Sequence, residues 1–217
     1  MVPPVSRETD DEDVVYVVDD NPGVCEALQA LFAAAGQACR VYPSGLAFID
    51  ALNAGFRGCV LLDQSMPGKT GLEVMETLRA KTPGLPVVMM TAQGDVALAV
   101  RAMKAGAFDF IEKPWRRGEL FDALERAMRA SLATRAQMAA SAKARATLDQ
   151  LTDREREVFD EIVTGATNKA IARKLRISQR TVEHHRASIM QKSQADNIVD
   201  LVRLSFQAGQ TPAALYG

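Results

Sequence analysis

The chain has 217 residues, a length that suits either one large domain or two modest ones. Apolar residues make up 47% of the chain and charged residues 24%, a composition that excludes disorder as the main state. The longest apolar runs, such as residues 14–18, are much shorter than the roughly 18 residues that a membrane-spanning helix needs, so we expect no membrane span. Acidic residues stand near the N-terminus where a secretory signal would place lysines, and we therefore expect a cytoplasmic protein.

Charge is distributed unevenly along the chain. Residues 1–129 carry 13 basic and 18 acidic side chains, whereas residues 167–192 carry seven basic side chains and one acidic side chain. An acidic half joined to a half with a basic focus predicts two domains that bind different partners.

Five short apolar runs alternate with amphipathic stretches in the first half of the chain. This alternation predicts an α/β domain in which helices cover a five-stranded parallel sheet. Between the runs, apolar residues such as Leu28, Leu31 and Phe32 recur at helical spacing and give the helix one face for the sheet. The predicted strands cover residues 14–18, 38–42, 58–62, 86–90 and 107–111.

Residues 119–164 contain neither glycine nor proline, and residues 130–150 are rich in alanine. Such a composition favours helix, and the lack of a wide apolar stripe predicts a largely exposed helical connector. A flexible alanine-rich coil is the alternative interpretation of this stretch.

Four short helices are predicted for the last 67 residues. Thr152 and Glu155 have the spacing of a capping box that begins the first helix. Thr167 and Ser178 can cap the second and third helices, which are joined by a tight turn in the manner of a helix-turn-helix. The second is predicted to cover residues 168–175, the third to end near residue 192, and the fourth to cover residues 196–208.

Five polar residues follow the predicted strands at their carboxyl ends. They are Asp19, Asp20, Asp63, Thr91 and Lys113. Because the carboxyl ends of parallel strands meet at one edge of an open sheet, we expect these side chains to share a rim. Three neighbouring carboxylates need a compensating cation, and oxygen ligands suit Mg²⁺ or Mn²⁺. Asp63 would then be a nucleophile toward a phosphoryl group that Thr91 and Lys113 contact. Acids that merely cap solvent-facing loops are the alternative for any one position, but this alternative explains the five together poorly.

Four segments resemble the receiver domain of bacterial response regulators. They are Val17–Asp20, Leu61–Gly68, Thr91–Asp95 and Ala102–Pro114. The last of these, together with Leu151–Val158 and Arg180–Glu183, is similar to the FixJ/NarL class with its LuxR-type output domain. The likeness covers nearly the whole chain.

The resemblance implies a fold class and a domain order. It implies a flavodoxin-like (βα)5 receiver domain at residues 14–129, and an all-α LuxR-type helix-turn-helix DNA-binding domain at residues 151–217. We expect a disordered N-terminal tail over residues 1–13 and a helical linker over residues 130–150.

The resemblance also implies a metal-dependent phosphoacceptor. Asp63 resembles the residue that takes a phosphoryl group from the phosphohistidine of a sensor histidine kinase. Asp20 and Asp63 would ligate Mg²⁺ directly, Asp19 would support it through water, and the backbone carbonyl of Ser65 would complete the protein ligands. Gln64 and Ser65 depart from the residues common after the acceptor, so the phosphoryl lifetime does not follow from the family.

Thr91 and Phe110 resemble the switch pair of such domains. The hydroxyl would move to the phosphoryl group, and the ring would turn inward behind it. The Lys113–Pro114 peptide bond is cis in such domains, which would aim the ammonium of Lys113 at the acceptor.

The third C-terminal helix is predicted to have an inward side and an outward side. An advance of about 100° per residue puts Val182 and Ile189 on one side, which should pack inward together with His185 and Arg186. The opposite side could enter a major groove. It consists of Arg180, His184, Ala187 and Gln191.

The LuxR-type resemblance implies base-facing positions at Glu183, His184 and Ala187 and phosphate contacts at Arg186, Lys169 and Lys192. The full set of predicted DNA-contacting residues is Lys169, Arg180, Thr181, Glu183, His184, Arg186, Ala187 and Lys192. His184 stands where the family more often has an aliphatic residue, so the base preference of relatives cannot be copied. The adjacent His184 and His185 diverge by about 100° on a helix and make a poor metal chelate.

These features together predict a phosphorylation-switched transcription factor and not an enzyme. We expect phosphorylation to pair two chains as a homodimer through residues 95–111 and to promote binding to double-stranded promoter DNA, where RNA polymerase is a possible partner. An aspartyl-phosphate hydrolase or phosphotransferase is one alternative, although such enzymes usually carry a second acid two residues after the nucleophile, where this chain has Ser65. A flavodoxin-like flavin binder and a degenerate receiver that never accepts phosphate are the others.

Overall fold

The computed structural model describes residues 13–53, 55–92 and 96–210, and the chain divides into two compact units, one through Arg135 and one from Ala136. Residues 1–12 of the expected disordered tail lie outside the described residues. Asp13 is described, and its carboxylate accepts a hydrogen bond from Arg135 Nη2 at 2.6 Å. None of the helices in the described ranges is long and apolar enough to span a bilayer.

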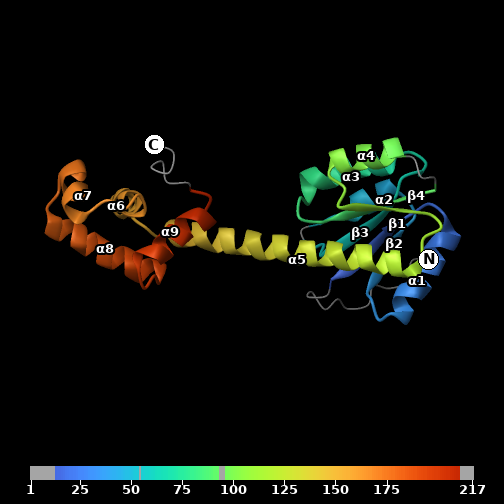
Figure 1. Ribbon diagram of the computed structural model, residues 1–217, viewed down its shortest axis with the longest axis horizontal. Coiled ribbons are helices and arrows are strands. Elements are labelled where there is room, and N and C mark those ends of the chain that lie inside the picture. The colour runs from blue at the N-terminus through green and yellow to red at the C-terminus, as the bar shows by residue number, and fades with distance from the viewer. Residues whose placement is uncertain (1–12, 54, 93–95, 211–217) are drawn as a thin grey trace. The chain divides into compact units, whose positions relative to one another are not determined.

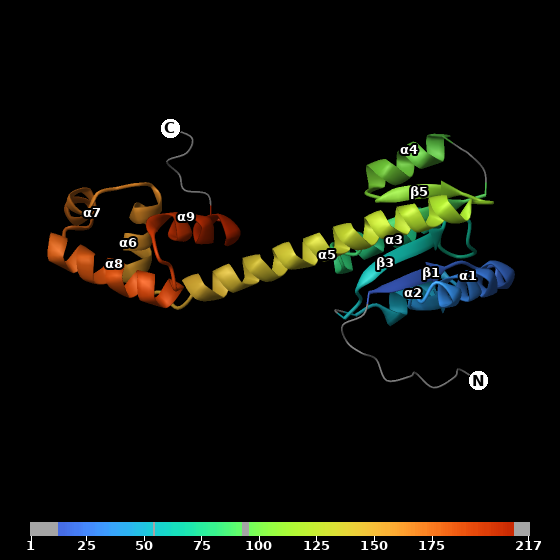
Figure 2. The ribbon, with the colours of Figure 1, turned by 60° about the horizontal axis from the view of Figure 1, so that its bottom comes forward.

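The first unit contains a five-stranded parallel sheet in the order β2-β1-β3-β4-β5 (Figures 1 and 2). This order is that of a flavodoxin-like fold, so the predicted fold class is confirmed. The strands are β1 Val14–Val18, β2 Cys39–Tyr42, β3 Gly58–Asp63, β4 Val87–Thr91 and β5 Asp109–Glu112. Strand β4 begins one residue later than predicted, at the residue after Pro86, and proline has no N–H to donate to a sheet.

Helices cover both faces of this sheet. They are α1 Pro22–Ala34, α2 Gly45–Ala51, α3 Gly71–Lys81, α4 Val96–Ala105 and α5 Arg117–Leu148. Helices α1 and α5 pack on one face, and α2, α3 and α4 pack on the other. The expected βα alternation is therefore present in all five repeats.

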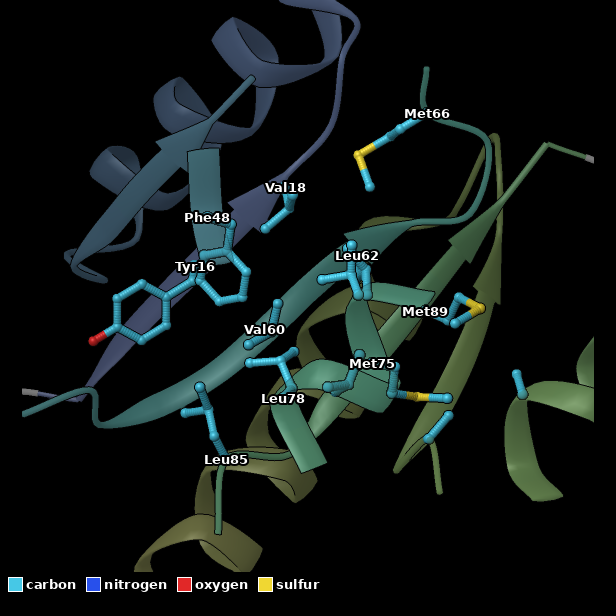
Figure 3. Packing of buried hydrophobic residues seen from close by; sticks show 14 of the residues in the cluster. Tyr16, Val18, Phe48, Val60, Leu62, Met66, Met75, Leu78, Leu85 and Met89 are labelled. Carbon is cyan, nitrogen blue, oxygen red and sulfur yellow. The ribbon is translucent and has the colours of Figure 1, made fainter. Parts of the chain in front are cut away.

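The two cores of the first unit follow from alternation along the strands. In β1, Val15 and Val17 belong to the cluster under α1 and α5, whereas Tyr16 and Val18 belong to the cluster under α2, α3 and α4. Successive side chains of a strand point to opposite faces, so a strand buried on both faces must be apolar throughout. Figure 3 shows the second cluster, in which Phe48 lies beside Tyr16 with ring centroids 6.1 Å apart.

The second unit consists of helices around a core of its own. They are α6 Asp153–Val163, α7 Asn168–Leu175, α8 Gln179–Ser193 and α9 Ile198–Gln207. The core contains Phe159 of α6, Ile171 of α7, Val182 of α8 and Leu201 of α9, and it also takes up Leu148 from the last turn of α5. The predicted caps of α6, α7 and α8 at Thr152, Thr167 and Ser178 are all confirmed.

Residues 117–148 form one continuous helix, α5. The flexible-coil alternative is therefore wrong for residues 130–148. The proposed use of this stretch as a connector between domains, and the domain limits themselves, stay predictions.

Candidate functional site

The residues predicted to share a rim stand where the strands of the first unit end. Asp19 directly follows β1, Asp63 is the last residue of β3, and Thr91 is the last residue of β4. The structure brings three of the charged groups into contact, because Lys113 Nζ donates to Asp19 Oδ2 at 2.5 Å and to Asp63 Oδ1 at 2.6 Å. The Lys113–Pro114 peptide bond is cis.

Both carboxylates in this contact are buried, Asp19 with 1% and Asp63 with 4% of their surface exposed. Their second oxygens accept backbone hydrogen bonds, from Asn21 N–H to Asp19 Oδ1 at 2.9 Å and from Ser65 N–H to Asp63 Oδ2 at 2.6 Å. A buried carboxylate is stable only when it is paired and hydrogen-bonded, and both conditions are met here.

The ammonium of Lys113 is held in its charged form. Burial lowers the pKa of this ammonium, but its hydrogen bonds to Asp19 and Asp63 outweigh that effect, and the net pKa lies above the ordinary value of 10.5. A permanent positive charge between two buried carboxylates offsets part of their mutual repulsion.

The acidic rim offers oxygen ligands of the kind that Mg²⁺ prefers. Asp20 is exposed next to the buried Asp19, and Ser65 is exposed two residues after Asp63. Within the described ranges, no three acidic, histidine or cysteine side chains form a complete metal cluster by themselves. Mg²⁺ usually keeps several waters and needs only one or two carboxylates, so this partial, all-oxygen donor set fits that ion.

The two residues of the predicted switch pair differ in exposure. Thr91 is buried with 8% of its surface exposed, whereas Phe110 on β5 is 40% exposed. Next to this ring, Asp109 accepts hydrogen bonds from Arg126 Nη2 at 2.5 Å and from the N–H of Phe110 at 2.9 Å. The ring of Phe110 therefore lies at the surface of the domain in this structure.

Two neighbours of the acidic rim were not identified from the sequence. Asn21 accepts hydrogen bonds from the N–H groups of Gly23 and Val24 and so begins α1 directly after the acidic pair. A Cβ on Gly71 would lie 2.6 Å from the backbone oxygen of Asp63, so only glycine lets α3 begin this close to the end of β3. For Gly71, the sequence did contain a signal: a glycine directly after Thr70, the N-cap of α3.

The second candidate site is the helix-turn-helix formed by α7 and α8. Arg176 in the turn adopts the left-handed conformation with φ of 55°, and Arg154 Nη2 donates to the carbonyl of Leu175 at 2.6 Å. The last carbonyls of a helix lack partners within the helix. Arg154 therefore supplies a hydrogen-bond donor to one of these carbonyls at the end of α7, just before the turn.

The inward and outward sides of α8 agree with the predicted helical wheel. Val182 and Ile189 are fully buried, and His185 and Arg186 are half-buried. The four residues predicted to project away are exposed; they are Arg180, His184, Ala187 and Gln191. Glu183 and Lys169 are exposed as well, and Thr181 is half-buried with its hydroxyl 2.8 Å from that of Ser178.

Lys192, which was predicted to contact a DNA phosphate, forms an ion pair within the protein. Its ammonium lies 2.6 Å from Oε2 of Glu155, a buried residue of α6. The sequence identified Glu155 only through its capping box, which the structure also contains.

Comparison with known proteins identifies the family. The family model of the response regulator receiver domain matches residues 15–125, and that of the luxR family of bacterial regulatory proteins matches residues 149–205. The transcriptional regulatory protein FixJ of Bradyrhizobium diazoefficiens is 39% identical over 195 residues, which cover 90% of this chain and 95% of that protein. The chain belongs to the FixJ-type response regulators. FixJ of Azorhizobium caulinodans is 42% identical over 205 residues, covering 92% and 94% of the two chains.

Solved structures agree with membership of the FixJ type. The response regulator StyR matches with a TM-score of 0.80 and 36% identity, covering 90% of this chain and 99% of StyR. Full-length FixJ from B. japonicum matches with a TM-score of 0.56 and 38% identity, covering 91% and 97%. The resemblance stated from the motifs is therefore confirmed: this is a two-component response regulator with a receiver domain and a LuxR-type DNA-binding domain, and it regulates transcription. The first domain implies a sensor kinase as partner, and the second implies DNA.

Proposed function

We propose that Asp63 accepts a phosphoryl group from the phosphohistidine of a sensor histidine kinase, and that this event promotes dimerisation and sequence-specific promoter binding. The observation that carries the proposal is the contact of one ammonium, that of Lys113, with the two buried carboxylates of Asp19 and Asp63. In the transfer, the nitrogen–phosphorus bond of the donor breaks and an oxygen–phosphorus bond to the Asp63 carboxylate forms. The leaving imidazole takes up a proton.

The surrounding residues have distinct proposed tasks. Asp20 and Asp63 would ligate Mg²⁺ directly, Asp19 would support it through water, and the carbonyl of Ser65 would complete the protein ligands. When bound, the ion neutralises charge between the carboxylate and the incoming phosphoryl group. Lys113 already lies against the acceptor oxygen and is placed to pair with a phosphoryl oxygen once the acceptor is modified.

Phosphorylation would shift an existing equilibrium between two conformations of the receiver. In the proposed switch, the hydroxyl of Thr91 moves toward the phosphoryl group, and the ring of Phe110 turns inward behind it. Because Phe110 is 40% exposed here, the inward turn would remove a large apolar side chain from the surface of β5. The surface of α4 and β5 would thereby change shape and pair two chains.

DNA binding is proposed to use the outer surface of α8. Glu183, His184 and Ala187 would face bases, supported by Arg180 and Thr181, while Lys169 and Arg186 would contact phosphates. Lys192 is left out of this set because its ammonium binds Glu155. Such a regulator would act in the cytoplasm, where promoter DNA lies, and RNA polymerase is a possible further partner there.

Activation should be visible as a change in mass and in DNA affinity. With Mg²⁺ and beryllofluoride, a mimic of the phosphoryl group, the full-length chain should change from monomer to dimer in sedimentation analysis. Its affinity for a duplex with two half-sites should rise at least about tenfold. In the dimer, the α8 helix of the second chain binds its half-site at a high effective concentration. The Asp63→Asn variant serves as the control and should show neither change. A monomer that stays unchanged in mass would remove dimerisation from the mechanism.

His184→Ala should alter sequence preference more than general affinity. The exposed imidazole stands on the groove-facing side of α8, and a lost base contact costs about 1 to 3 kcal/mol at one base pair only. Selection of bound duplexes from a random-sequence pool, compared between the variant and the wild type, measures this preference. Gln207→Ala, on α9, is the control. An equal loss of affinity on all duplexes would instead identify His184 as a contact to the DNA backbone.

A further inference from the structure

Two helices of this protein begin with the same Thr-x-x-Glu capping box, but the two glutamates differ in burial. At α3, Glu73 Oε2 accepts hydrogen bonds from the N–H and the hydroxyl of Thr70, both at 2.8 Å, and Glu73 stays exposed. At α6, Glu155 Oε2 accepts from the N–H of Thr152 at 2.8 Å and from its hydroxyl at 3.1 Å, yet only 5% of Glu155 is exposed. Capping alone does not require burial of the carboxylate. The burial of Glu155 therefore indicates a second task.

The additional partners of Glu155 come from α8, the helix proposed to enter the major groove. Ser188 Oγ donates to Glu155 Oε1 at 2.5 Å, and Lys192 Nζ donates to Glu155 Oε2 at 2.6 Å. Ser188 and Lys192 are four residues apart in α8 and so lie on the same side of that helix. Hydrogen bonds from Lys192 and Ser188 hold the pKa of Glu155 at about 2, so the carboxylate is charged at neutral pH. One buried charge thus joins the start of α6 to the second half of α8.

These hydrogen bonds restrict a rotation of α8 about its axis that apolar packing restricts only weakly. Val182 and Ile189 anchor α8 in the core, but hydrophobic contacts are not directional. Hydrogen bonds weaken steeply when their angle departs from linear, so they resist rotation of α8 about its axis. Such a rotation would displace the groove-facing His184 and Ala187, and recognition requires side chains held to within roughly 0.5 Å.

We propose that Glu155 is a positioning residue for DNA recognition, which sets the rotation of α8 through Ser188 and Lys192, and that Lys192 serves this ion pair and not a DNA phosphate. The inference rests on the proposed function, because it presupposes that the outer side of α8 reads bases. It assigns to a residue of α6, outside the helix-turn-helix, a part in sequence choice.

The test uses the full-length chain activated with Mg²⁺ and beryllofluoride. Wild type is compared with Glu155→Gln and Lys192→Met. Glu73→Gln is the matched control because it alters the corresponding glutamate of the α3 capping box, which is exposed. Affinity is measured for a duplex that the wild type has selected from a random-sequence pool and for an unrelated duplex, each over a range of salt concentrations. Circular dichroism identifies a temperature at which every variant is folded, and all binding is measured there.

Glu155→Gln and Lys192→Met should each lower the affinity ratio between the selected and the unrelated duplex about tenfold, the size of one lost base contact. Affinity for the unrelated duplex and its salt dependence should stay at the wild-type level in both variants. In the double variant, the affinity ratio should fall by less than the product of the two single-variant factors, because the two side chains act as one unit. The Glu73→Gln control should match the wild type.

Two results would overturn the inference. If Lys192→Met weakens both duplexes equally and lowers the salt slope by about 0.9, Lys192 contacts a phosphate. If Glu155→Gln leaves the ratio unchanged, or weakens both duplexes by the same factor, Glu155 does not position α8. Failure of the wild type itself to prefer any duplex would count against the proposed DNA-binding function and is distinguishable from both results.

Discussion

The Asp63→Asn variant should incorporate no phosphoryl group when the full-length chain is incubated with Mg²⁺ and acetyl phosphate. The wild type should gain one group that is stable to acid and labile to base, as an acyl phosphate is. An amide oxygen is a far weaker nucleophile than a carboxylate, so the loss should be at least about a hundredfold. Intact-mass measurement before and after mild alkali checks the result.

Unfolding should not explain this loss. In the variant, Lys113 can keep its 2.5 Å contact with Asp19, so the buried ammonium remains paired. The Asp122→Asn variant, which changes an exposed aspartate on α5, is the matched control and should be labelled like the wild type. Persistence of the label in Asp63→Asn would refute the assignment of the acceptor.

Lys113→Met should destabilise the receiver by about 3 kcal/mol in the absence of divalent ions. The substitution leaves Asp19 and Asp63 facing each other, and removing one partner of a buried ion pair strands an uncompensated charge. Added Mg²⁺ should restore more stability to the variant than it adds to the wild type, because the carboxylates no longer have the ammonium as an alternative cation. Denaturant unfolding followed by the fluorescence of Trp115, the only tryptophan, measures both effects.

The matched control for this experiment is Lys81→Met, an exposed position in the last turn of α3, which should shift stability by no more than about 0.5 kcal/mol. Equal stability of Lys113→Met and the wild type would show that the two ion pairs contribute nothing net. A response to Mg²⁺ no larger than that of the wild type would contradict a metal site at these carboxylates.

Local signals in the sequence were sufficient for most of the fold. The short continuous apolar runs predicted all five strands, and the caps Thr152, Thr167 and Ser178 predicted the starts of three helices that the structure confirms. Each of these signals acts over only a few residues, so it can be read without knowledge of the partner element. The gathering of the residues that follow the strands was predictable too, because the carboxyl ends of parallel strands meet at one edge of the sheet.

Contacts between distant segments were not predictable in the same way. The ammonium of Lys192 binds Glu155, which is 37 residues earlier in the sequence, and no local pattern indicated this ion pair. The same applies to the exposed ring of Phe110 and to the close approach of Gly71 to the end of β3. Each depends on where one helix or strand lies against another.

By itself, the sequence determined the order of helices and strands, their alternation in the first unit and the residue types gathered at the edge of the sheet. It did so because hydrophobic periodicity and capping are properties of short stretches of chain. Tertiary packing alone decided that Lys192 pairs with Glu155, and that the ammonium of Lys113, which the family resemblance directs at Asp63, also pairs with Asp19. The physical reason is that the energy of a charge depends on its burial and on neighbours within a few ångströms, and folding brings those neighbours from remote parts of the sequence.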